Sequence, residues 1–137
     1  MENSLRILLV FMATLLASPT WAEDEEVIVP KAIYYAIPEP FTINFLNQSN
    51  QQARYLQIKV TLKSTNAEAI GSAEQNLPMI QDALLDLFSD QSYDEANSVD
   101  GRQTLQQNTL ETVKTILKEE TGNDAIEAIY FTSFILQ

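Results

Sequence analysis

The stretch YLQIKVTL, residues 55–62, is the longest strictly alternating segment of the chain and decides the fold. In an extended strand, successive side chains point to opposite faces, so this alternation separates an apolar face from a polar one. The apolar face consists of Leu56, Ile58, Val60 and Leu62. The polar face consists of Tyr55, Gln57, Lys59, Thr61 and the following Lys63. We therefore predict a strand with one buried face and one solvated face.

Downstream of this strand, from Asn66, the spacing of the apolar residues changes from two to about 3.6, which predicts helices. Proline is tolerated in the first turn of a helix but costs about 3 kcal/mol in its interior. Pro78 therefore predicts one helix over 66–75 and a second over 77–89, with Asn76 as a cap; a single kinked helix is the alternative. The expected inward-facing residues are Ile70, Ala73, Leu77, Ile80, Leu84 and Phe88.

A further helix is predicted from Ser98, a good N-terminal cap, to about Glu120, and Gly122 supplies the left-handed residue that ends it. Its inward stripe consists of Leu105, Leu110, Val113, Ile116 and Leu117. The preceding segment 90–100 is polar and acidic, and we predict a solvated loop there. A calcium loop does not fit, because with Gly101 at its sixth position the first and twelfth positions hold Ala96 and Gln107.

Two more extended segments accompany the central strand. Residues 41–46, FTINFL, direct Phe41, Ile43 and Phe45 inward and precede a polar turn over 47–52, which predicts an antiparallel hairpin. The last segment, 125–136, is apolar on both sides, so we expect both of its faces to be covered. Its two expected faces are Ile129, Phe131 and Ile135 against Tyr130, Phe134 and Leu136. The predicted fold class is α+β, with a small mixed or antiparallel sheet covered by helices.

The composition excludes several functions. A formal net charge of -11 and a pI of about 4.2 disfavour binding to nucleic acid or to an anionic lipid surface. With no His and no Cys, this chain cannot supply a Ser-His-Asp triad, a Cys nucleophile or a structural zinc site. A hydrolase using two carboxylates remains conceivable, but no pair is singled out by its spacing. We expect no catalysis, no metal, no cofactor and no small-molecule substrate.

The N-terminus has the pattern of a secretory signal. An uninterrupted apolar run over 7–17 is followed by Ser18, Pro19 and then Thr20-Trp21-Ala22, with small residues at the third-last and last positions before a cut after Ala22. As a helix this run would be about 17 Å long, against about 30 Å for the hydrocarbon core of a membrane. We predict residues 1–22 to be a signal peptide cleaved after Ala22, with a retained short membrane anchor as the alternative. Residues 23–39 are predicted to be an acidic and aromatic linker, and residues 40–137 the folded domain.

Residues 31–40, KAIYYAIPEP, are apolar and aromatic and end in two prolines, which suits an edge strand or an extended linker. Tyr34 and Tyr35 are expected to pack on the domain, with docking on a partner as the alternative. Because this segment lies where a linker would meet a neighbour, the candidate partner-contact residues are Tyr34, Tyr35 and Ile37.

Five segments of the chain together are typical of one family. They are PFTINFL (40–46), RYLQIKVTL (54–62), LPMIQDALLDLFSD (77–90), DGRQTLQQ (100–107) and IYFTSFILQ (129–137). In order and spacing they resemble FliL, the family of flagellar basal-body-associated proteins. The resemblance implies a periplasmic domain similar to the stomatin-type (SPFH) domain, which forms a homo-oligomeric ring around the stator proteins MotA and MotB at the inner membrane. It also implies support of torque, swimming or swarming, without catalysis.

One feature departs from the family, whose members usually keep a full membrane-spanning helix near the N-terminus, whereas this chain has only the short run 7–17. From the residues alone, the apolar last strand and the aromatic segment 33–37 offer more nonpolar surface than a monomer needs, which favours a self-associating protein. A secreted periplasmic binding or inhibitor module unrelated to the motor would use the same surface and is the alternative function.

Overall fold

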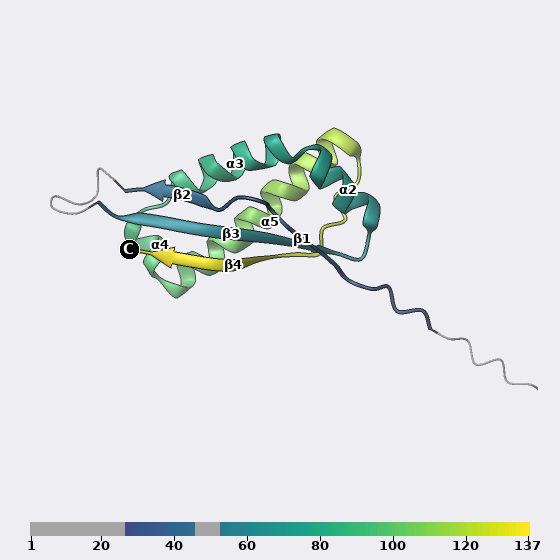
Figure 1. Ribbon diagram of the computed structural model, residues 1–137, viewed down its shortest axis with the longest axis horizontal. Coiled ribbons are helices and arrows are strands. Elements are labelled where there is room, and N and C mark those ends of the chain that lie inside the picture. The colour runs from purple at the N-terminus through teal and green to yellow at the C-terminus, as the bar shows by residue number, and fades with distance from the viewer. Residues whose placement is uncertain (1–26, 46–52) are drawn as a thin grey trace, which may run out of the picture.

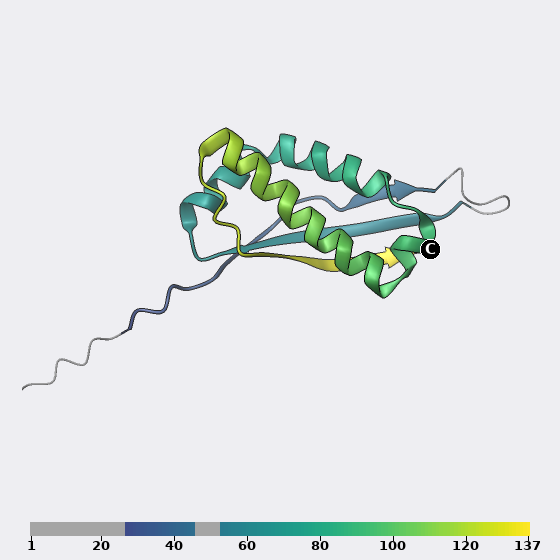
Figure 2. The ribbon, with the colours of Figure 1, turned by 180° about the vertical axis from the view of Figure 1, so that it is seen from behind.

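A computed structural model describes residues 27–45 and 53–137, which form a sheet with helices packed on one of its faces (Figures 1 and 2). The elements in chain order are β1 Ile33–Ala36, β2 Phe41–Asn44, β3 Tyr55–Ser64, α2 Ala67–Gln75, α3 Leu77–Ser89, α4 Tyr93–Asn97, α5 Val99–Thr121 and β4 Ala128–Leu136. The predicted α+β class is confirmed, and all strand pairs are antiparallel.

Strand β3 is the centre of the sheet. Leu56 lies between Ile43 of β2 and Leu136 of β4, so β2 and β4 occupy opposite edges of β3. Leu62 lies between Tyr35 of β1 and Ile129 of β4, so β1 shares its edge with β2. The segment expected to be an edge strand or a linker is therefore an edge strand. The sheet begins at Ile33, inside the stretch 23–39 that was expected to be a linker.

The alternation of β3 produces the core as predicted. Its four apolar residues, Leu56, Ile58, Val60 and Leu62, are all buried under the helices, and its polar residues lie on the other face. Phe88 of α3 is fully buried, and its ring packs edge-on against the aromatic rings of two strand residues. Its ring centroid is 5.1 Å from that of Phe41 and 6.0 Å from that of Phe131. These contacts fix α3 to both edges of the sheet.

The helix boundaries agree with the predicted ones to within one residue. Asn66 Oδ1 accepts a hydrogen bond from the Ala69 N–H at 3.0 Å and starts α2. Pro78 lies in the first turn of α3, which confirms two helices rather than one kinked helix. The Asn76 side chain does not cap α3, because it donates to the Ser72 carbonyl at 2.9 Å instead. At the other end of the helical layer, Gly122 ends α5 with φ 73°.

The prediction of a plain loop over 90–100 is wrong, because this segment contains the short helix α4. Ser92 and Glu95 form a reciprocal capping box, in which the Ser92 hydroxyl accepts from the Glu95 N–H and the Glu95 carboxylate accepts from the Ser92 N–H. The Arg102 side chain then donates to the Ala96 carbonyl at 3.0 Å. These bonds hold α4 against the first turn of α5.

Within the described residues, helices cover β4 on one face only, and cover of its other face by the N-terminal aromatic segment or another subunit stays a prediction. Lys59 pairs with Ser133 whereas Val60 pairs with Phe131, so Thr132 is an extra residue that forms a β-bulge. Beyond the bulge the side chains change sides, which brings Phe134 to the helix-covered face together with Phe131. Ile135, expected on the face of Phe131, lies on the opposite face instead. The inserted residue therefore puts Phe131, Phe134 and Leu136 on the helix-covered face and leaves Tyr130 and Ile135 on the opposite face.

Several predictions fall outside the described residues: the signal or anchor over 1–22, the acidic run over 23–26 and the turn over 47–52. Within residues 27–45 and 53–137, no helix is both long and apolar enough to cross a membrane.

Candidate functional site: the open face of the sheet

The helices leave one face of the sheet uncovered, and we call it the open face (Figures 1 and 2). Its most exposed side chains come from three strands: Tyr34, Tyr55, Lys59, Tyr130 and Ile135. Tyr34 is 62% exposed, and the other three apolar or aromatic members are between 40% and 45% exposed. Large exposed aromatic side chains on a flat surface are typical of a site that binds another protein.

Two of these tyrosines meet across the central strand. The ring centroids of Tyr34, from β1, and Tyr130, from β4, lie 6.4 Å apart, with an angle of 39° between the ring planes. Thr61, which faces Tyr130 in the β3–β4 ladder, is only 8% exposed although it lies on this face. The tyrosine pair therefore forms an apolar patch on the open face.

The open face also carries positive charge in a chain of net charge -11. Lys59 and Lys63 both point to this side of β3, and Lys63 lies 4.0 Å from the Glu127 carboxylate at the rim. Lysine beside tyrosine can contact carboxylates and apolar groups of the same partner. The arrangement suits an amphipathic protein surface with acidic residues.

The three candidate partner-contact residues are placed differently. Tyr34 lies on the open face. Tyr35 points to the core side, where burial, and then the nearby Glu74 charge, raise the pKa of its phenol. Ile37 is 4% exposed and belongs to the core. A docking role for all three stays a prediction, but the geometry offers only Tyr34 at the surface.

Sequence reasoning did not select Tyr130 or Lys59 as contact residues. The alternation of β3 already placed Lys59 on the polar face, which was the available signal. Tyr130 lies before the bulge in β4, so the face it occupies could be inferred from the alternation of the strand. Its exposure could not, because apolar residues alternate on both faces of β4 in the sequence.

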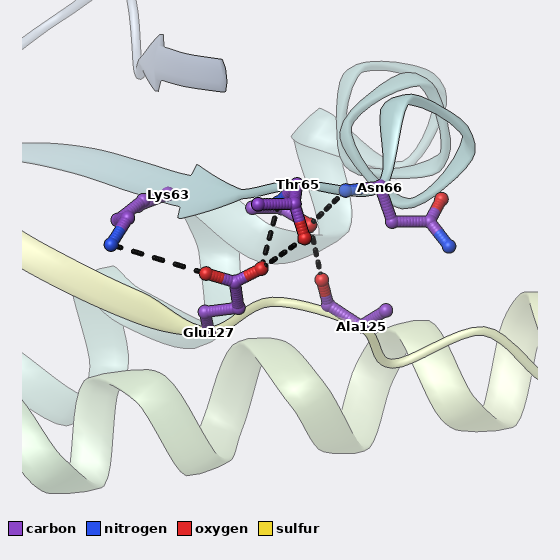
Figure 3. Close-up of polar contacts among 6 residues, drawn as sticks. Lys63, Thr65, Asn66, Ala125 and Glu127 are labelled. Carbon is purple, nitrogen blue, oxygen red and sulfur yellow. Dashed lines mark hydrogen bonds and ion pairs between the residues drawn. The ribbon is translucent and has the colours of Figure 1, made fainter. Parts of the chain in front are cut away.

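A polar cluster holds the rim of the open face together (Figure 3). The Glu127 carboxylate, just before β4, accepts from the Thr65 N–H at 2.9 Å and from the Thr65 hydroxyl. The buried Ser64 hydroxyl donates to the Ala125 carbonyl and accepts from the Asn66 N–H at 2.9 Å. Together these bonds join the end of β3 and the start of α2 to the segment that leads into β4.

The hydrogen bonds from the Thr65 side chain and backbone, with a smaller contribution from Lys63, lower the pKa of Glu127. A carboxylate whose pKa is lower in the folded state stabilises the fold above its unfolded pKa, and this contribution disappears as the pH falls through the folded pKa. Replacing Glu127 by Gln should therefore lower the free energy of unfolding at pH 7. The difference from wild type should begin to shrink below the unfolded pKa of about 4.3 and vanish below the lower pKa of the folded state. Urea unfolding at pH 7, 5 and 3 measures it.

Glu111→Gln is the matched control, because Glu111 is an exposed carboxylate on α5. Its effect on stability should be small and should not follow the same pH dependence. A Glu127→Gln difference of equal size at pH 7 and pH 3 would contradict the assignment.

Among the residues that the structure describes, no group of three or more acidic side chains is placed to hold a metal ion.

Comparison with known proteins gives consistent matches. Residues 34–137 match the family model described as "Flagellar basal body-associated protein FliL". The "Flagellar protein FliL" of Aquifex aeolicus (strain VF5) is 28% identical over 105 residues, which cover 77% of this chain and 62% of that protein. The "Flagellar protein LafL" of Vibrio parahaemolyticus serotype O3:K6 (strain RIMD 2210633) is 22% identical over 90 residues, which cover 66% of this chain and 54% of that protein. The chain thus aligns with less than two thirds of the length of either relative.

Proposed function

The chain belongs to the FliL family of flagellar basal body-associated proteins, and from this membership we propose that it is a non-enzymatic accessory of the flagellar motor that acts through protein contacts. The family is a flagellar accessory family and not a known enzyme family. The observation that carries the proposal is the open face, where exposed tyrosines and lysines lie opposite the helical layer. A helix-covered sheet with one such face is suited to bind a neighbouring protein.

The proposed location is the periplasm, at the inner membrane beside the basal body. There the domain self-associates around the stator proteins MotA and MotB and supports torque during swimming or swarming. The proposed domain similarity is to the stomatin-type (SPFH) domain. In this proposal the N-terminal segment is either cleaved after Ala22 or retained as an anchor, and the mass of the N-terminus in cells distinguishes the two.

The proposal predicts that Lys59→Glu weakens recovery of MotA and MotB by about tenfold or more, because central contact residues of an interface contribute about 1.4 kcal/mol or more. The measurement is an in-cell crosslink and pull-down of the tagged full chain, together with swimming diameter in soft agar. The circular dichroism spectrum should not change, since Lys59 is exposed.

Lys114→Glu is the control, because it makes the same charge reversal on α5, away from the open face. It should leave recovery and swimming unchanged. If Lys59→Glu recovers MotA and MotB as well as wild type does, the open face is not the stator contact. If wild type brings down unrelated periplasmic proteins and no stator protein, the alternative function, a periplasmic binding or inhibitor module, replaces the motor role.

A further inference from the structure

The outer edge of β2 has backbone groups available for another strand. In the antiparallel ladder with β3, Phe45 donates its N–H to the Arg54 carbonyl at 2.9 Å, so every second residue from Phe45 points its backbone inward. By this alternation the N–H and C=O groups of Thr42 and Asn44 point away from β3. Among the described residues no strand pairs with this edge of β2, and the side chains of Thr42 and Asn44 are exposed.

At the opposite edge of the sheet, formed by β4, a side chain occupies one of the outward backbone groups. There the Gln106 side chain of α5 donates to the Ile129 carbonyl of β4 at 2.7 Å, which occupies part of the edge. Beside β2, by contrast, the surface is hollowed into a groove of about 400 Å³ between the strand and α3. Leu85, which is 42% exposed, lines this groove together with Glu39 and Asp82. The β2 edge therefore combines free backbone groups, an apolar contact and negative charge.

The chain also contains a segment that matches this edge. Residues 27–31, VIVPK, which we call the arm, precede β1 in the chain and extend away from the domain (Figure 1). Val27, Ile28 and Val29 are 84%, 88% and 79% exposed. Three consecutive β-branched residues favour a strand, yet they contact nothing that buries them. The arm therefore has the composition of a strand but pairs with no strand among the described residues.

We propose that the arm of one copy adds as an antiparallel strand to the β2 edge of a second copy, a mode of binding that deepens and rests on the self-association proposed above. In the register that places Val29 opposite Thr42 and Val27 opposite Asn44, these four residues form the hydrogen-bonded pairs. The nitrogen of Pro30, which cannot donate, then points away from β2. Ile28 lies on the side of the groove.

Charge supports the antiparallel direction. In this register Lys31 comes to lie opposite Pro40, which follows Glu39 in the chain. In the parallel direction Lys31 would lie at the other end of β2, near Phe45. The antiparallel arrangement is therefore the one that brings the cation of the arm to the end of β2 near Glu39.

The arm cannot reach the β2 edge of its own chain. Along β3, the partners of Ile33 and Ile43 are Ser64 and Leu56, eight residues and about 26 Å apart. The five residues from Ile33 back to Ile28 span at most about 18 Å, and they leave β1 in the direction away from β2. The partner edge therefore belongs to another copy. Because arm and edge are different surfaces, the contact continues head to tail into a ring or a filament.

The absence of cysteine from the chain allows a direct test. Full-length Val29→Cys and Thr42→Cys variants with different tags are mixed and mildly oxidised, since opposed residues of a hydrogen-bonded pair lie about 5.5 Å apart, within disulfide range. The expected result is a disulfide heterodimer at least tenfold more abundant than from Val29→Cys with Thr132→Cys, an exposed threonine of β4. Adding Ile28→Asp to the first pair should remove the heterodimer.

Equal heterodimer yields from the two pairs would overturn the proposal, as would heterodimer that survives Ile28→Asp. The same cells are assayed for recovery of MotA and MotB, which separates this inference from the proposed function. Recovery of the stator without the disulfide would leave the motor role standing and reject the arm contact. A specific disulfide without stator recovery would support the arm contact and reject the motor role.

Discussion

Replacing Phe88 by alanine should lower the free energy of unfolding by about 3–5 kcal/mol, the range typical for removing a buried aromatic side chain. Phe88 is fully buried and joins α3 to the sheet through edge-on contacts with Phe41 and Phe131. Its removal leaves a cavity between the layers and also removes both aromatic contacts. Because a domain of this size is stable by only about 5–15 kcal/mol, much of its stability should disappear. Urea unfolding of the purified chain, followed by far-ultraviolet circular dichroism, measures the loss.

Leu85→Ala is the matched control for this prediction. Leu85 lies on the same helix but is 42% exposed, so its truncation should cost less than about 1 kcal/mol. If both substitutions cost the same, Phe88 does not have the central place in the core that its contacts indicate.

Replacing Gly101 by alanine should destabilise the domain by about 1–3 kcal/mol or more, the cost of forcing extra atoms into a packed site. A β-carbon at this position would lie 2.0 Å from the Glu95 carbonyl oxygen and 2.7 Å from the Ser98 hydroxyl oxygen. The carbonyl belongs to α4, so the backbone of α4 would have to move away from α5. Thermal and urea unfolding measure the cost, and the loss of helix signal reports the displaced segment.

The same substitution at Gly71 should have the opposite sign. Gly71 lies inside α2, and a β-carbon there would meet no atom within 4 Å. Alanine in a helix interior is favoured over glycine by about 0.5–1 kcal/mol, so Gly71→Ala should stabilise the domain. If Gly71→Ala and Gly101→Ala shift stability in the same direction, lack of space for a β-carbon is not the reason for glycine at position 101.

The elements that could be predicted from the sequence are those whose signals are local. The alternation of β3 and the apolar stripes of α3 and α5 each extend over many residues. Burial confirms them except at Leu77 and Leu110, which are half-buried. The ends of α5 at Ser98 and Gly122 were predicted because one side chain or one backbone conformation decides each of them. Helix α4 was missed although Ser92 and Glu95 have capping-box spacing, because the acidic composition of 90–100 outweighed a five-residue signal.

The candidate site could be predicted only in part, because it depends on pairing between distant strands. A bulge changes which face each later residue of a strand occupies, and nothing in the local pattern of β4 marks Thr132 as the extra residue. Ile135 was therefore assigned to the wrong face. Similarly, the inward direction of Tyr35 and Ile37 follows from the register of β1 on β3, which the segment 31–40 does not specify by itself.

The position of β4 in the sheet also determines when the fold can form. Thr61 and Thr132 lie side by side, with their hydroxyl oxygens 3.4 Å apart, although they are 71 positions apart in the sequence. Closing so long a loop is entropically costly, and sheets that depend on such pairing fold slowly. During synthesis, one edge of β3 and its apolar face stay uncovered until α5 and β4 have been made. The nascent chain therefore passes through a stage in which β3 has an unpaired edge that could pair with other chains, so aggregation competes with folding until β4 is in place.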